Sequence, residues 1–242
     1  MKLTDFQVLT FDCYGTLIDW ERGILDALAP LNRLLAKPHE CDRILEDFAL
    51  EELAQETATP AMLYPQVLAE VHRRLAKRWR IDAPQGMAET FGASVPSWPA
   101  FPDSTTALMY LAKYYKLVIL SNVDRAGFAA SNQRLGVTFD AIYTAEDIGS
   151  YKPDERNFRY LLDHVVSDLQ CESSQILHTA QSLFHDHVPA RKFNLANAWI
   201  DRRHDLQGWG ATKAPEQRPA VDFHFHSMAE LVVAHQKAIR EG

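Results

Sequence analysis

Short apolar runs alternate with amphipathic stretches along much of this chain, and this pattern predicts strands that alternate with helices. The runs with the length and composition of buried strands are residues 8–12, 117–120, 141–144, 175–180, 196–200 and the short 223–225. Helical spacing of apolar residues marks 104–115, a stretch through Phe128 and Leu135, 158–166 and 228–239. Strands that alternate with helices favour an α/β fold with a parallel sheet covered on both faces.

Residues 19–94 break this alternation, because they contain helical patterns and no strand-like run. Apolar residues recur at helical spacing over 24–35, 44–53 and 64–79, and a further helix follows the break at Pro84-Gln85-Gly86. The stretch Pro96–Pro102 holds three prolines in seven residues and cannot continue a helix. We therefore predict a core domain of residues 1–18 and 99–242, with residues 19–98 inserted as a helical domain.

Composition and charge narrow the class of protein. The chain has 242 residues, enough for a sizeable core, and a net charge of −7, which gives no reason to expect a nucleic-acid partner. No apolar run approaches the length needed to cross a bilayer, and Met1–Phe6 lacks the apolar segment of a secretory signal, so we expect a cytoplasmic protein. The three cysteines are too far apart for a disulfide framework or a zinc pattern.

Polar residues follow several of the predicted strands. Asp12 comes directly after the first run, the pair Ser121-Asn122 after the second, and Lys152 and Asp186 lie in loops beyond later strands. Because the carboxyl ends of parallel strands meet at one edge of a sheet, we expect these side chains to converge there. A plain strand-turn with an Asp cap, or a structural ion pair between Lys152 and Asp186, is the alternative interpretation.

These residue types suit covalent catalysis. Asp12 could attack an electrophilic centre and form an ester or acyl phosphate, while Lys152 keeps it ionised and oriented. Thr16, Ser121 and Asn122, with backbone amides of the Asp12–Thr16 turn, could bind the carboxylate or phosphate of the substrate. Asp186 could position the water that hydrolyses the intermediate.

In these motifs the chain resembles the haloacid dehalogenase superfamily. The first motif is Asp12-Cys13-Tyr14-Gly15-Thr16-Leu17, the second Leu120-Ser121-Asn122, the third Tyr151-Lys152-Pro153-Asp154, and the fourth the loop with Asp186. The resemblance covers nearly the whole chain and implies a Rossmann-like core with a cap domain inserted after the first motif. It also implies catalytic roles for Asp12, Lys152, Asp186, Thr16, Ser121 and Asn122.

The residue two positions after the nucleophile indicates the branch of the superfamily. Phosphatases of this superfamily carry a second Asp there, whereas this chain has Tyr14, whose phenol is poorly matched to acid–base work at neutral pH. The fourth motif contains one clearly matching carboxylate, Asp186, instead of the acidic pair typical of magnesium-binding members. We therefore expect no metal and no other cofactor, and the motif resembles that of L-2-haloacid dehalogenases.

The chain departs from those dehalogenases in the cap. They use a cap arginine to receive the halide. The corresponding stretch of this chain is approximately residues 47–55, which contain no arginine, and Arg43 lies too early in the sequence to match. The segments 12–20 and 178–187 instead resemble L-azetidine-2-carboxylate hydrolases, in which the leaving group is an amine. Acidic Glu51 or Glu52, or a neutral histidine such as His185, would suit a cationic ring nitrogen.

The expected substrate is a small 2-substituted carboxylic acid. Asp12 would displace the leaving group from C2, or open a ring there, through an aspartyl ester. Cys13 is either a reactive thiol at the site or a small buried side chain that points away from it, since neighbours on a strand face opposite sides. The full set of expected substrate-binding residues is Cys13, Tyr14, Trp20, Glu51, Glu52, Ser121, Asn122, Phe184 and His185. Haloacid dehalogenation is the second option, and a magnesium phosphatase or a non-catalytic ligand-binding module is more distant. A homodimer is common among relatives, but no sequence feature decides the oligomeric state.

Overall fold

The core of the molecule is one parallel sheet of six strands. The structure is a computed structural model and describes residues 1–241. The strands are β1 (Val8–Phe11), β2 (Lys116–Ser121), β3 (Ala141–Thr144), β4 (Ile176–Ala180), β5 (Ala196–Ile200) and β6 (Phe223–Phe225). Their order across the sheet is β3-β2-β1-β4-β5-β6, and every pair is parallel. The predicted α/β class and all the predicted strands are confirmed.

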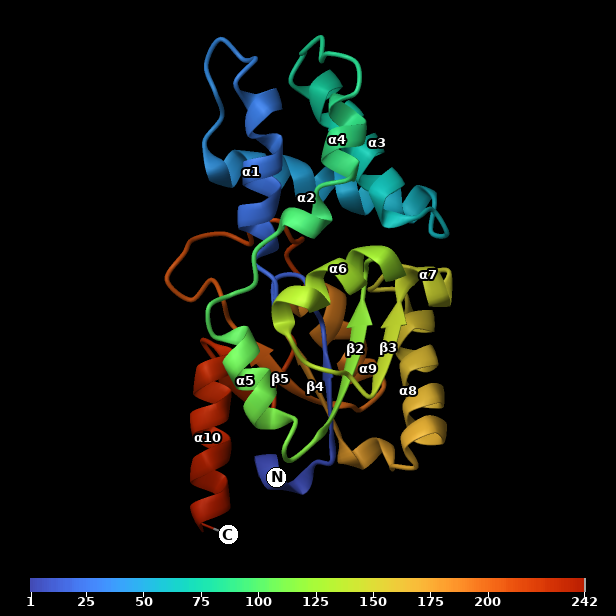
Figure 1. Cartoon of the computed structure of the whole chain (residues 1–242), viewed down its shortest axis with the longest axis vertical. Helices are drawn as coiled ribbons and strands as arrows, with labels where there is room; N and C mark the ends of the chain where they lie inside the picture. Colours follow the sequence, from blue (N-terminus) through green and yellow to red (C-terminus); the bar gives the residue numbers. More distant parts are fainter. Residues whose placement is uncertain (242) are drawn as a thin grey trace.

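Helices cover both faces of this sheet (Figure 1). They are α5 (Ser104–Leu111), α6 (Arg125–Leu135), α7 (Ala145–Ile148), α8 (Glu155–Leu169), α9 (Val188–Lys192) and α10 (Met228–Glu241). Successive strand residues face opposite sides, so Leu9 joins the cluster built with α5, α6 and α10, while Val8 joins the cluster built with α8 and α9. Within residues 1–241, no helix combines the length and hydrophobicity that crossing a bilayer requires.

Three local details differ from the sequence prediction. The helix α5 ends at Leu111, and residues 112–115 turn back toward β2. The short helix α7 was not predicted, although Thr144 and Asp147 form a capping box that begins it. The segment around Asp186 is a π-helical turn, Leu183–His187, where a loop was expected. Such one-turn π-helical segments are frequent at functional sites.

The inserted segment between β1 and β2 is helical, as predicted. It contains α1 (Trp20–Asn32), α2 (Cys41–Ala58), α3 (Tyr64–Arg78) and α4 (Met87–Gly92). Figure 1 shows these helices beyond the carboxyl ends of the strands, at the end of the molecule opposite to both termini. We refer to residues 19–98 as the cap; its treatment as a separate domain remains a prediction.

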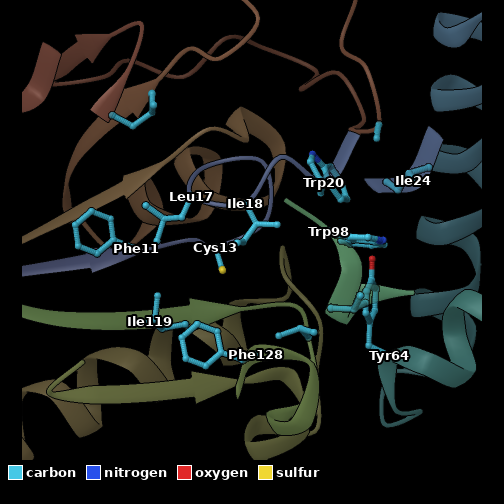
Figure 2. Close-up of a cluster of buried hydrophobic side chains, with 14 of the residues drawn as sticks. Phe11, Cys13, Leu17, Ile18, Trp20, Ile24, Tyr64, Trp98, Ile119 and Phe128 are labelled. Carbon is cyan, nitrogen blue, oxygen red and sulfur yellow. The ribbon is translucent and has the colours of Figure 1, made fainter. Parts of the chain in front are cut away.

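The two chain segments that enter and leave the cap lie side by side. Ile18 and Ala100 form an antiparallel bridge, and the Asp19 amide donates to the Pro99 carbonyl over 2.8 Å. Trp98 then packs on α1 at Gly23, where a Cβ atom would lie 2.3 Å from the indole Cγ. Figure 2 shows Trp98 and Tyr64 in one apolar cluster with Ile18 and Trp20, so the base of the cap is continuous with the core.

Candidate active site

The carboxyl edge of the sheet brings together residues that are far apart in the sequence. Asp12 follows β1, Ser121 ends β2 with Asn122 behind it, and Asp186 lies in the turn after β4. Because β2, β1 and β4 are neighbours in the sheet, their ends meet under the cap. The predicted convergence of these residues is therefore what the structure shows, with Lys152 reaching the same point from the segment before α8.

Lys152 bridges two carboxylates. Its Nζ donates to Asp12 Oδ1 over 2.8 Å and to Asp186 Oδ1 over 2.7 Å. A third hydrogen bond, of 3.1 Å, reaches the Leu120 carbonyl at the end of β2. All three ammonium hydrogens are thus used, and the side chain is only 2% exposed. This arrangement fixes both carboxylates relative to each other.

The turn after β1 orients the other oxygen of Asp12. The Thr16 hydroxyl donates to Asp12 Oδ2 over 2.6 Å and accepts from the Gln181 amide over 2.9 Å. Gly15 has φ of +93°, in the left-handed region that favours glycine, and a Cβ atom there would lie 2.9 Å from Trp20 Nε1. The tight turn therefore needs a glycine to bring Thr16 back onto Asp12.

Asn122 holds the backbone of Lys152. Its Oδ1 accepts from the Lys152 amide over 2.7 Å and its Nδ2 donates to the Lys152 carbonyl over 3.0 Å. Asn122 also lines the cavity next to Asp12, so its second amide hydrogen is available to a ligand. Ser121, by contrast, is buried and does not line the cavity, and its Oγ has no hydrogen-bond partner among the described residues.

Burial and the charges of this cluster shift its pKa values in different directions. Burial raises the pKa of Asp12 above its ordinary value, although Lys152 opposes this; burial would lower the pKa of Lys152, but Asp12 and Asp186 raise it above its ordinary value. Burial would also raise the pKa of Asp186, yet Lys152 and a hydrogen bond from His178 hold it well below the ordinary value. Lys152 is therefore an ammonium and Asp186 a carboxylate near neutral pH.

His178 is a site residue to which the sequence gave no role. Its Nε2 lies 3.1 Å from Asp186 Oδ1, and its Nδ1 lies 2.9 Å from Thr10 Oγ1. It is fully buried in β4, behind Asp186 as seen from the cavity. His178 therefore positions Asp186, whose second oxygen, Oδ2, has no partner among the described residues.

The cap closes the cavity over Asp12. Trp20 from α1, Glu52 and Glu56 from α2, and Tyr64 from α3 line it from the cap, and Tyr14 from the turn after β1 completes this part of the wall. The cavity volume is about 40 Å³, whereas roughly 10–15 Å³ suffices for one water molecule. Only a compact ligand fits without movement of the cap.

Of the two acidic cap residues that the sequence suggested, only Glu52 lies at the site. The Glu51 carboxylate points to the other side of α2, where it accepts from Arg74 Nε over 2.6 Å and from Arg78 Nε over 2.8 Å. Burial opposes ionisation of Glu51, but these two arginines lower its pKa. Glu56, one helical turn after Glu52, takes the place that was considered for Glu51.

Two other expected substrate contacts lie outside the inner cavity. Figure 2 shows Cys13 among apolar side chains on the side of Ile119 and Phe128, and burial raises the pKa of its thiol well above the ordinary value. Cys13 is therefore the small buried side chain of the two alternatives. Phe184 lines a neighbouring outer cleft of about 430 Å³, with the Lys213 ammonium 5.2 Å from its ring centroid.

His185 lines the inner cavity as expected. Its Nδ1 lies 3.2 Å from the hydroxyls of both Ser182 and Thr212, and burial lowers its pKa to about 4. The ring is therefore neutral near pH 7. A neutral imidazole that accepts a hydroxyl hydrogen at Nδ1 carries its own hydrogen at Nε2, where it can donate to a ligand.

Comparison with known proteins identifies the family. The model of the haloacid dehalogenase-like hydrolases matches residues 6–172, which is more than half of the chain. The chain therefore belongs to this family, and the protein is a hydrolase. A comparison with curated protein sequences finds no match.

Solved structures of similar fold span nearly the full length of the chain. The L-2-haloacid dehalogenase from Xanthobacter autotrophicus is 19% identical, with a TM-score of 0.76 over 96% of this chain and 99% of that chain. The defluorinating L-2-haloacid dehalogenase Rha0230 is 17% identical, with a TM-score of 0.76 over 97% and 98%. The HAD-hydrolase YfnB from Bacillus subtilis, solved bound to magnesium, is 17% identical, with a TM-score of 0.73 over 96% and 99%. At these identities the likeness establishes the fold.

The residues at this site do not fit a magnesium ion. Magnesium requires several oxygen ligands in octahedral geometry, whereas Lys152 and Thr16 engage both oxygens of Asp12. The Tyr14 phenol bonds to Ser131 Oγ over 2.8 Å, and burial raises its pKa well above the ordinary value. Among residues 1–241, no group of three or more His, Cys, Asp or Glu side chains is placed to hold a metal.

Proposed function

We propose that this hydrolase displaces a leaving group from C2 of a small 2-substituted carboxylic acid through an ester on Asp12. The first-choice substrate is L-azetidine-2-carboxylate, which would be opened to 2-hydroxy-4-aminobutyrate. The geometry supports Asp12 as the nucleophile, because it lines the cavity and its two oxygens are oriented by Lys152 and Thr16.

The observation that carries the choice of substrate is the acidic chemistry of the cap wall. Glu52 and Glu56 face the cavity, and neither arginine nor lysine from the described cap residues lines it. Arg43, the arginine nearest in sequence to residues 47–55, is exposed and bonds to Asp47 over 2.9 Å. A wall of two carboxyl groups favours a cationic leaving group and disfavours an anion.

The chemical steps balance without a cofactor. Asp12 attacks C2, an ester C–O bond forms, and the C2–N bond breaks with its electron pair left on nitrogen. Water positioned by Asp186 then attacks the ester carbonyl, which restores the Asp12 carboxylate and frees the 2-hydroxy acid. The proton that hydrolysis releases is taken up by the new primary amine, so the net reaction adds one water.

The substrate carboxylate needs hydrogen-bond donors at the core side of the cavity. Asn122 has one amide hydrogen beyond the bond to Lys152, and His185 has its Nε2 hydrogen when neutral. We assign the carboxylate to these two groups. Thr16, which the sequence suggested for this task, is committed to Asp12 and Gln181 and instead orients the nucleophile.

Hydrolytic dehalogenation of an L-2-haloacid is the second candidate. Full-length structural likeness to enzymes named as L-2-haloacid dehalogenases favours it. A halide that departs toward Glu52 and Glu56 would be repelled unless both carboxyl groups are protonated, and otherwise it must depart toward a donor such as His185. This cost makes it the second choice.

Substrate consumption followed by NMR tests the proposal. L-azetidine-2-carboxylate and L-2-chloropropionate are incubated side by side with enzyme in EDTA. We expect loss of the azetidine with appearance of 2-hydroxy-4-aminobutyrate, and no effect of the chelator. Turnover of the chloro acid alone would establish the dehalogenase instead, and activity only after magnesium is added back would overturn both.

A further inference from the structure

The cavity contains one carboxyl group that the protein leaves unpartnered. Glu52 Oε1 accepts a hydrogen bond of 2.6 Å from the Tyr64 hydroxyl. Glu56, one turn later on α2, is only 4% exposed, and no described residue makes a hydrogen bond with its carboxyl group. Burying a carboxyl without a partner costs free energy, so a ligand that pairs with it is favoured.

Glu56 also lies at the boundary between the inner cavity and the outer cleft. It and Lys152 line both the inner cavity beside Asp12 and the outer cleft of about 430 Å³. Arg156 and Lys213 line that outer cleft and can attract a carboxylate from solvent. A zwitterion that moves inward from the cleft therefore meets Glu56 before it reaches Asp12.

We propose that Glu56 is the specificity-determining residue that receives the cationic nitrogen of the substrate, and that this cation replaces a proton held by the Glu52–Glu56 pair. The inference rests on the proposed function and deepens it. Glu52 stays fixed by Tyr64 and supplies the second charge. Breaking of the C2–N bond then releases the amine next to Glu56, where the protonated product is stabilised in turn.

The electrostatics of the pair agree with this exchange. Burial raises the pKa of Glu52 to about 8, although the hydrogen bond from Tyr64 opposes this. Burial and the neighbouring charge of Glu52 raise the pKa of Glu56 well above the ordinary value, and Lys152 opposes this. Two such carboxyl groups titrate as a pair, so the Glu52–Glu56 pair holds a proton near neutral pH when no ligand is bound.

Several other titratable groups face Glu56, and most of them keep one charge near neutral pH. Burial raises the pKa of Tyr64 and Tyr151, Lys152 stays an ammonium, Asp186 a carboxylate, and His185, with a pKa of about 4, stays neutral. In the outer cleft, Asp154 stays a carboxylate and Arg156 a guanidinium, and Lys213 lines the same cleft. Burial raises the pKa of Asp12 above its ordinary value, and any change in its charge acts on both test ligands, because both carry a carboxylate.

The test compares two ligands that differ in the nitrogen alone. L-azetidine-2-carboxylate is assayed as substrate, and cyclobutanecarboxylate, which has the same ring without nitrogen, as a competitive inhibitor. In E56Q we expect KM for the azetidine to rise at least tenfold, with the inhibition constant of the carbocycle unchanged or lower. In the wild type we expect kcat/KM to rise with pH as the Glu52–Glu56 pair loses its proton. In E52Q, whose amide oxygen still accepts from Tyr64, we expect the same rise at lower pH.

Calorimetry supplies a readout that a structural role would not move. Binding of the azetidine in two buffers of different ionisation enthalpy should show release of a proton near pH 7 in the wild type and a clearly smaller release in E56Q, where only Glu52 of the pair is left to titrate. An equal loss of affinity for both ligands in E56Q, or proton release as large in E56Q as in the wild type, overturns the role of Glu56 and leaves the proposed function intact. A wild-type protein that binds the azetidine but does not open it overturns the proposed function, while the comparison of the two ligands still decides the role of Glu56. A wild type that binds neither ligand overturns both.

Discussion

The Lys152 ammonium donates to Asp12 Oδ1 over 2.8 Å while the same nitrogen holds Asp186, so a single cation sets the position of both carboxylates. The two acids come from different strands, β1 and β4, and the cation comes from a third segment. Loss of this cation would leave two buried carboxylates without their shared partner.

Replacement of the proposed nucleophile should stop the reaction without unfolding the protein. Asp12→Asn keeps the shape of the side chain but removes its nucleophilic oxygen, so we expect turnover to fall by at least about 10³-fold. Thr16→Val serves as the comparison: the nucleophile remains and loses one orienting bond, and we expect a loss of about tenfold. Near-equal activity of D12N and wild type, measured by the same NMR assay, would exclude covalent catalysis by Asp12.

Removal of the bridging cation should destabilise the fold. Lys152→Met leaves two buried carboxylates unpaired, and we expect a loss of about 3–5 kcal/mol in the free energy of unfolding at pH 7. Lys192→Met is a matched control, because Lys192 is 59% exposed and bonds only to Glu155, so the loss should stay below about 1 kcal/mol.

The effect of Lys152→Met should also depend on pH. In the wild type the folded pKa of Asp186 lies below the unfolded value, so this carboxylate contributes stability above pH 4 that disappears as the pH falls. In K152M the folded pKa would lie above the unfolded value, so the variant gains stability as the acid takes up a proton. Urea unfolding should therefore show a smaller gap between the two proteins at pH 4.5 than at pH 7; a constant gap would contradict this explanation.

Tyr14 should prove to be a wall residue and not an acid. Its phenol donates to or accepts from Ser131 Oγ, and burial raises its pKa. We expect Tyr14→Phe to lower kcat/KM less than about tenfold, because only a hydrogen bond is lost. A drop of about 10³-fold, with an unchanged fold by circular dichroism, would instead identify the phenol as a proton donor.

The contact between α1 and Trp98 gives a stability test. In Gly23→Ala the new methyl carbon would lie 2.3 Å from Trp98 Cγ, so the cap helix must shift at a cost of about 1–3 kcal/mol, despite the better helix propensity of alanine. In Gly86→Ala nothing lies within 4 Å, and only the φ of +87° opposes the change. Thermal unfolding should show a larger fall in Tm for G23A; the reverse order would contradict the packing argument.

Much of the fold could be predicted from the sequence, because buried parallel strands leave near-continuous apolar runs. Val8–Phe11 and Ile176–Ala180 show this clearly, and both are fully buried in the sheet. The convergence of Asp12, Lys152 and Asp186 was predictable for a related reason: strand ends meet at one edge. The helix α7 could have been found from Thr144 and Asp147, whose spacing is that of a capping box.

The cap wall could not be predicted with the same accuracy. Successive helix residues differ by about 100° in direction, so a shift of one residue separates Glu51, on the arginine side, from Glu52, in the cavity. Both sides of α2 carry buried acids, and the sequence therefore lacks the contrast between apolar and polar faces that orients most helices. Glu56 and His178 depend on contacts between distant segments, which spacing alone does not reveal.

The side-by-side crossings at Ile18–Asp19 and Pro99–Ala100 have a topological consequence. Because the inserted segment starts and finishes at neighbouring points, the sheet would need only a short turn to close without it, and loop closure of that kind adds little entropy cost. We therefore expect the helices of the insertion to be exchangeable on a scaffold that carries Asp12, the proposed nucleophile. Substitution of these helices, with the carboxyl groups on α2, would change which leaving group is accepted while the chemistry of Asp12 stays the same.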